Sequence, residues 1–346
     1  MKKLISAFLA ASLALSLAAC GGSSASSAAA STASSSASTS SKTITLKLGH
    51  QSATTVPEGE AMQWFADEVN ARTNGAVTID IYPNEELGDA VTMVDMTKLG
   101  TCDLVLAAVG NVATYDSYFN IGAVPFLFKD NSIAAELNAG EIGQHEEASL
   151  QQNGLHIVNT ARNFYRGPYR VLVSKKPVNS LDDIQGLRFR AYESQVYMNA
   201  WTALGANPIV IAWSETYSAL QQGTVDAATS TIGQLNSVKF TEVAPYVTRI
   251  NEYASEAVLI ANSKKWDSLS AEQQQIITDV ANEAGDKMSE LLDTSVQKDI
   301  DEMTAAGAVF SDIDTTPFRE KLIDFYRGLE KDGTLPEGLV DKALNA

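Results

Sequence analysis

The segment QGLRFRAYESQVYMNAWTALGANPIVIA, residues 185–212, decides the fold class because a strand, a helix and a second strand follow one another in it. LRFRAY, residues 187–192, alternates apolar and polar side chains, as a half-buried strand does. ESQVYMNAWTALG, residues 193–205, is predicted to be a helix that ends at a glycine. NPIVIA, residues 207–212, is predicted to be the next strand. Strands alternating with helices indicate an α/β protein with largely parallel sheets.

The same alternation continues on both sides of this segment. Two α/β halves joined by several crossings of the chain imply a cleft between two lobes. We expect residues 43–167 plus 256–295 to form lobe 1 and residues 168–255 plus 296–346 to form lobe 2. The other elements predicted are strands at 43–50, 76–83, 102–109, 169–175 and 308–313, and helices at 58–73, 89–100, 214–223, 270–305 and 316–333.

The N-terminus resembles a bacterial lipoprotein signal. Two lysines precede an apolar run that is shorter than an ordinary membrane span, and the sequence LAACG follows. Residues 1–19 are therefore predicted to be a signal peptide, with Cys20 lipidated at the start of the mature chain. An ordinary signal peptide with an incidental cysteine is the alternative. Residues 20–42 are dominated by serine and alanine and are predicted to be a flexible tether.

Composition excludes several classes of function. The 346 residues carry a formal net charge of −17, which argues against nucleic acid as a partner because phosphate binding needs a basic surface. The sequence contains no nucleotide-binding glycine loop and no GxSxG motif, and the three histidines lack metal-ligand spacing. We therefore expect no cofactor, no metal and no enzyme active site. The only other cysteine, Cys102, lies in an apolar run and is expected to be buried.

Two arginines within strand-like runs are candidates for an anion site. Arg190 lies in LRFRAY, and Arg170 lies in YRVLVSK. A planar guanidinium matches a carboxylate with two parallel hydrogen bonds. The alternatives are a solvated sheet face or an internal ion pair, for example between Arg190 and Glu193.

Several motifs, taken together in their order, resemble the DctP-type solute-binding proteins of tripartite ATP-independent periplasmic (TRAP) transporters. The resemblance covers residues 43–333, almost all of the chain after the tether. It implies a two-lobed periplasmic-binding-protein-like fold that closes around an organic acid. The motifs are YPNEELGD, KLGTCDLVLA, VPFLF, KKPVNSLDDIQGLRFRA, ALGANP, AWSETYSALQQGTVD and KKWDSLSAEQQQII.

The resemblance also implies which residues hold the solute. Gly186 to Ala191 is similar to a family motif whose last basic residue, here Arg190, pairs with the ligand carboxylate. Arg170 occupies the place of a second arginine, with Arg162 and Arg166 as nearby competitors. Trp213 corresponds to an aromatic residue that packs against the solute, although a core role is equally open.

One stretch departs from the family pattern. Where the family has V-D-G-x-E-N-P, this chain has VDAATST, residues 225–231, with Ser230 at the place of an asparagine that often helps hold the carboxylate. A serine hydroxyl still donates a hydrogen bond but has less reach. Gln234 and Asn236 are candidate substitutes. Asn111 and His50 follow predicted strands whose carboxyl ends face the cleft, and they complete the set of candidate ligand contacts.

The sequence thus favours a lipid-anchored, monomeric, extracytoplasmic receptor. It binds a small organic acid, either a sugar acid or a dicarboxylate, and the resemblance implies delivery to the membrane subunits of a TRAP permease. A surface sensor that presents a bound acid to a signalling partner is the first alternative. A cell-surface enzyme acting on an acidic sugar is the second.

Overall fold

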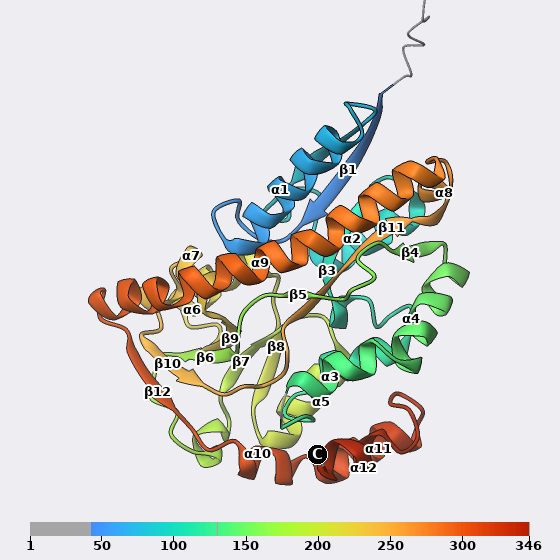
Figure 1. The fold of residues 1–346 in the computed structure, drawn as a ribbon. Helices are drawn as coiled ribbons and strands as arrows, with labels where there is room; N and C mark the ends of the chain where they lie inside the picture. The colour runs from blue at the N-terminus through green and yellow to red at the C-terminus, as the bar shows by residue number, and fades with distance from the viewer. Residues whose placement is uncertain (1–42, 130, 346) are drawn as a thin grey trace, which may run out of the picture. The chain divides into compact units, whose positions relative to one another are not determined.

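The computed structural model describes residues 43–129 and 131–345, which form one compact unit (Figure 1). The predicted signal peptide, the lipidation site Cys20 and the predicted tether lie outside the described residues. In the described part of the chain, no helix has both the length and the apolarity that crossing a membrane requires.

The first sheet combines N-terminal strands with one strand from near residue 260. β1 runs parallel to β2 and β3, whereas β11 runs antiparallel to its neighbours. In spatial order the strands are β2 (Val77–Tyr82), β1 (Ile44–His50), β3 (Leu104–Ala108), β11 (Glu256–Asn262) and β4 (Leu155–Ile157), and β5 (Phe164–Tyr165) also pairs with β11.

The second sheet combines the middle of the chain with one strand from near residue 310. β7 runs parallel to β8, as the opening segment predicts, and also to β9. In spatial order the strands are β12 (Val309–Asp312), β10 (Tyr246–Arg249), β6 (Arg170–Ser174), β9 (Ala227–Thr231), β7 (Arg188–Ala191) and β8 (Asn207–Val210).

The prediction of largely parallel sheets is wrong in one respect, because both sheets are mixed. β11 is antiparallel to β3, and β6 is antiparallel to both β9 and β10. The chain reaches β6 from the first sheet and β11 from the second. A strand that enters a sheet from the opposite lobe begins at the edge of that sheet where the parallel strands end, and it therefore runs antiparallel to them. The two crossing strands therefore start beside the ends of parallel strands, β11 beside the carboxyl end of β3 and β6 beside that of β9.

Helices cover both faces of each sheet, and four hydrophobic clusters fill the layers between them. Cys102 is fully buried in this core, as expected, and burial raises the pKa of its thiol. The helices are α1 (Pro57–Arg72), α2 (Ala90–Leu99), α3 (Asn131–Asn138), α4 (Glu141–Gln152), α5 (Gln195–Leu204), α6 (Thr216–Gln222), α7 (Ile232–Ser237), α8 (Ser263–Asp267), α9 (Ala271–Ala305), α10 (Thr316–Lys321), α11 (Ile323–Lys331) and α12 (Leu339–Asn345).

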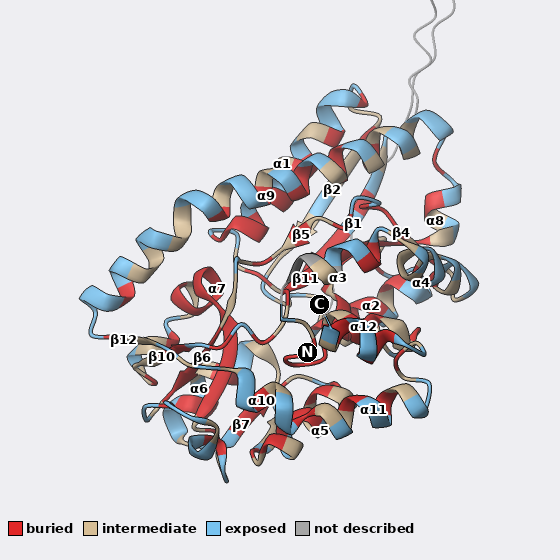
Figure 2. Cartoon of the chain, turned by 60° about the horizontal axis from the view of Figure 1, so that its bottom comes forward, coloured by how far each residue is buried: buried red, intermediate tan, exposed pale blue. Residues whose placement is uncertain are grey.

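The long helix α9 packs on both lobes. Ile277 to Leu292 contribute to the cluster under the first sheet, whereas Met303 belongs to a cluster under the second. Figure 2 shows buried residues along one side of this helix and exposed residues along the other. Ser270 caps its N-terminus by accepting a hydrogen bond from the backbone of Gln273. The lobe boundary that we predict at residue 295 falls inside this unbroken helix and remains a prediction.

A candidate ligand-binding cleft

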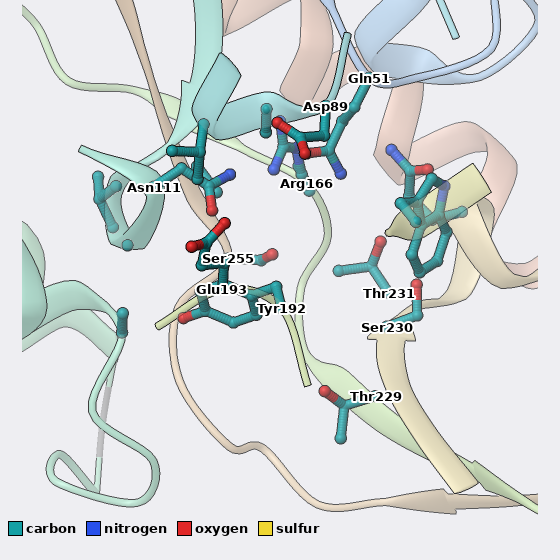
Figure 3. A pocket seen from close by; sticks show the side chains of 18 of the residues that line it. Gln51, Asp89, Asn111, Arg166, Tyr192, Glu193, Thr229, Ser230, Thr231 and Ser255 are labelled. Carbon is teal, nitrogen blue, oxygen red and sulfur yellow. The ribbon is translucent and has the colours of Figure 1, made fainter. Parts of the chain in front are cut away.

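A pocket lies where the crossing strands begin and the parallel strands end. The first lobe contributes the last residue of β3, residues 109–111 after it and the start of β11, and the second lobe contributes the ends of β7 and β9. Figure 3 shows Asn111, Ser255, Tyr192 and Glu193 on one side of this pocket, Thr229, Ser230 and Thr231 on another, and Gln51, Asp89 and Arg166 above them.

Arg170, the first residue of β6, lines the pocket but is already hydrogen-bonded by protein groups. Its Nε donates to Glu252 at 2.9 Å, and its terminal nitrogens donate to Ser255 at 3.1 Å and Thr229 at 2.7 Å. Its guanidinium also lies over the Tyr253 ring, 4.5 Å from the centroid. Burial alone lowers the pKa of Arg170, but Tyr253 and Glu252 raise it overall. Arg170, whose side chain is 11% exposed, therefore shapes the pocket wall as a largely buried, paired cation.

The competing arginines are paired as well. Arg166 forms a buried ion pair with Glu58. Arg162 contacts two buried carboxylates, Glu146 at 2.6 Å and Glu256 at 2.8 Å. Arg166 and Glu256 both line the pocket. Each of these arginines thus has a carboxylate partner within the protein.

Arg190 differs from the other three arginines. It is the third residue of β7, its side chain is buried with 9% exposed, and its Nε donates to the Ile211 carbonyl at 2.8 Å. Across residues 43–129 and 131–345 no carboxylate forms an ion pair with it, Glu193 included, and no acceptor bonds its two terminal nitrogens. Burial lowers the pKa of Arg190. A buried cation without a carboxylate is costly, and an anionic ligand would supply the missing partner.

Trp213 combines the two roles that the sequence leaves open. It lines the pocket, and the Arg190 guanidinium lies 5.6 Å from its ring centroid. It also packs against Phe240 at a centroid distance of 5.0 Å. Phe240 belongs to the cluster under the second sheet, so Trp213 is a half-buried ring between core and pocket.

The structure places the remaining candidates in three ways. Asn111, Ser230 and Gln234 line the pocket with Arg190. Asn236 instead donates to Asp299 and Glu302 on α9, at 2.8 Å and 3.0 Å. His50 does not line the pocket either. It is the last residue of β1, fully buried, and its Nδ1 accepts a hydrogen bond from the backbone of Ser52.

Several pocket residues were not predicted from the sequence. Tyr192 and Glu193 follow β7 directly, so the end of a predicted strand was a usable signal for them. Gln51 follows β1, where the side chain after His50 faces the pocket. The loop carrying Glu85 and the helix start at Asp89 gave no comparable signal. Among the described residues, no cluster of histidine, cysteine, aspartate and glutamate could hold a metal ion.

The burial of Glu146 yields a prediction about how stability depends on pH. Burial raises the pKa of Glu146 from 4.5 to about 7, although Arg162 opposes the shift. Because the folded state holds this proton more tightly, Glu146 reduces stability as the pH rises from about 5 to 8, by at most about 3 kcal/mol. We expect the free energy of unfolding, measured in urea, to fall less over this range in Glu146→Gln than in the parent. Identical pH dependence of the two proteins would contradict the prediction.

The fold and the cleft define a class of protein: a two-lobed α/β receptor with a pocket suited to a small anion. The sequence matches the family described as bacterial extracellular solute-binding protein, family 7 (DctP), over residues 48–332. The chain belongs to this family. The match confirms the resemblance to TRAP solute-binding proteins and an extracytoplasmic location.

Known relatives agree with this assignment. The 2,3-diketo-L-gulonate-binding periplasmic protein YiaO of Escherichia coli is 32% identical over 80% of this chain and 84% of its own. A TRAP periplasmic solute-binding protein from Polaromonas sp. JS666, solved with D-erythronate, is 27% identical with a TM-score of 0.80, covering 87% of this chain and 98% of that one. A third, from Sulfitobacter sp. NAS-14.1, has 22% identity and a TM-score of 0.81 over 87% and 100% of the two chains, and confirms the two-lobed fold.

Proposed function

We propose that the protein is a receptor that binds one small organic acid, a sugar acid or a dicarboxylate, and delivers it to a TRAP-type permease. The observation that carries the proposal is Arg190, a buried guanidinium facing the pocket without a carboxylate partner among the described residues. The ligands named for YiaO and for the Polaromonas protein are organic acids, which supports the same class here.

In the proposed complex, the solute carboxylate pairs with Arg190. Asn111, Ser230 and Gln234 add hydrogen bonds from the pocket wall, Trp213 packs against the solute, and Arg170 holds the wall in place. In a closed, desolvated site such a charge pair is stronger than in water. No bond of the solute is made or broken.

Contacts across the cleft support a role for lobe closure. Gln234, from α7 of the second lobe, donates to Ser52 of the first lobe. The backbone N–H of Ser214 donates to Glu85 at 3.3 Å across the same cleft. A solute touching both lobes adds contacts that exist only in the closed state and therefore shifts the equilibrium toward it. The closed form is the signal that a permease can recognise.

The proposal extends to the membrane. Lipidation at Cys20 with a Ser/Ala-rich tether to residue 42 would keep a monomeric receptor close to its permease. A lipid chain with a flexible linker raises the local concentration of the receptor at the membrane surface.

A ligand screen tests the proposed function. Thermal unfolding of the purified protein is followed with a panel of sugar acids, dicarboxylates and matched neutral sugars. Because a ligand that binds only the folded state stabilises it, we expect the midpoint to rise with organic acids and to stay constant with neutral sugars. A rise with neutral sugars alone would overturn the proposal.

A further inference from the structure

The charges around the pocket are unevenly distributed. Its only cationic lining residues in the described chain are Arg166, Arg170 and Arg190, and the first two are paired with Glu58 and Glu252. One positive charge is therefore available to a solute. A second carboxylate on that solute would find no further guanidinium, ammonium or imidazolium in this part of the pocket wall.

The available negative charges are more numerous. Glu85, Asp89 and Glu193 line the pocket, and within residues 43–129 and 131–345 none of them forms an ion pair. Glu85 accepts the Ser214 backbone N–H and Asp89 caps α2 through Thr92, so both carboxylates are held in position. A second solute carboxylate would therefore be repelled, whereas a hydroxyl group could donate to these oxygens.

Two buried polar atoms in the wall also lack a partner. The Gln234 amide oxygen and the Thr231 hydroxyl have no hydrogen bond within the described chain, although both residues line the pocket and are at most 6% exposed. The Gln234 amide nitrogen already donates a hydrogen bond to the Ser52 hydroxyl. This bond fixes the orientation of the Gln234 amide oxygen. Unsatisfied buried acceptors cost free energy, and solute hydroxyls would satisfy them.

We propose that the pocket selects a polyhydroxylated monocarboxylate, such as an aldonate, and discriminates against dicarboxylates through Glu193, Glu85 and Asp89. This inference rests on the proposed receptor function and narrows its solute class. Arg190 pairs with the single carboxylate of the solute. The acidic side chains and the unpaired oxygens of Gln234 and Thr231 accept hydrogen bonds from its hydroxyl groups. A dicarboxylate would place its second charge among these same groups.

The test compares acids that differ in one group. Isothermal titration calorimetry of the purified protein is performed with aldonates of four to six carbons and with the aldarates of the same carbon skeleton, in which a terminal hydroxymethyl group is replaced by a carboxylate. Unsubstituted fatty acids of the same lengths complete the panel. We expect the tightest aldonate to bind at least about tenfold more tightly than its aldarate and its fatty acid, a difference of about 1.4 kcal/mol.

Glu193→Gln tests the proposed origin of the discrimination, since glutamine keeps an acceptor oxygen but removes the charge. In Glu193→Gln, we expect the ratio of aldonate affinity to aldarate affinity to fall severalfold. Glu215→Gln is the matched control, because Glu215 is exposed on a nearby turn outside the pocket lining. The aldonate-to-aldarate affinity ratio of Glu215→Gln should match that of the parent protein.

The outcomes separate this inference from the receptor function on which it rests. Aldarates that bind as tightly as aldonates, or a ratio unchanged in Glu193→Gln, would overturn the inference and leave an organic-acid receptor standing. Fatty acids that bind as tightly as aldonates would overturn the role of the hydroxyl groups. Absence of binding by every carboxylate would overturn both proposals.

Discussion

Arg190→Ala is expected to lower affinity for the solute by at least about tenfold, since removing one partner of a desolvated charge pair costs about 2 to 5 kcal/mol. Folding should be almost unaffected, because in the described chain the side chain bonds only to the Ile211 carbonyl. Removing a buried cation that lacks a partner relieves a desolvation cost, so the ligand-free variant should be at least as stable as the parent. Calorimetric titration and urea unfolding measure the two effects.

Arg188→Ala is the matched control for this variant. Arg188 lies two residues earlier on β7, is half exposed and pairs with Asp226 at 2.7 Å, outside the pocket lining. Its loss should leave affinity unchanged. Arg190→Lys keeps the charge but loses the planar fork, so its affinity should fall between those of the parent and the alanine variant. Equal affinity of Arg190→Ala and the parent would remove Arg190 from the site.

Glu252→Ala is expected to have the largest effect on stability, about 3 to 5 kcal/mol, because it leaves Arg170 buried without its carboxylate. The Glu252 side chain is fully buried, and one oxygen accepts from Arg170 at 2.9 Å while the other accepts from Trp201 Nε1 at 2.7 Å. Trp201, a residue of α5, is itself fully buried in a hydrophobic cluster. The free energy of unfolding in urea measures the loss.

Two further variants separate the contributions at Glu252. Glu252→Gln keeps an acceptor for Trp201 and removes the charge that faces Arg170, so it should be destabilised less than the alanine variant. Asp226→Ala breaks the exposed pair with Arg188 and should change stability little, since surface ion pairs contribute little. A loss in Glu252→Ala no larger than that in Asp226→Ala would show that the buried pair does not stabilise the fold.

Local sequence patterns were sufficient for the elements that alternate or have helical spacing. Strands predicted at 43–50, 76–83 and 102–109 correspond to β1, β2 and β3, and the helix predicted at 270–305 corresponds to α9. In each of these the side chains carry the period of the element, so no knowledge of the partner is needed.

β11 and its short neighbours β4 and β5 lacked such a signal. Every residue of β11 is buried, so its apolar run shows no alternation and does not distinguish a strand from a helix. β4 and β5 contain three and two residues, too few for any period, and they exist as strands because β11 lies beside them. The antiparallel pairs follow from long-range topology, which the sequence does not display locally.

The candidate site, too, could be predicted from local sequence only in part. Arg190 and Arg170 were both found by their place in strands, yet the sequence did not distinguish the free cation from the paired one. That difference depends on Glu252, which lies 82 residues from Arg170 in the chain. His50 was expected at the cleft because it ends a strand, but the alternation of side chains turns it into the core and leaves Gln51 at the pocket.

The central place of β11 dictates an order of events during biosynthesis. β3 and β4 lie on either side of this strand, so the first sheet remains incomplete until residue 262 has been made. By then every strand of the second sheet except β12 has already been synthesised. Contacts this distant in sequence slow folding, because a long loop must close before they form. A chain exported across a membrane gains from this delay, since it remains unfolded, and therefore translocatable, for longer.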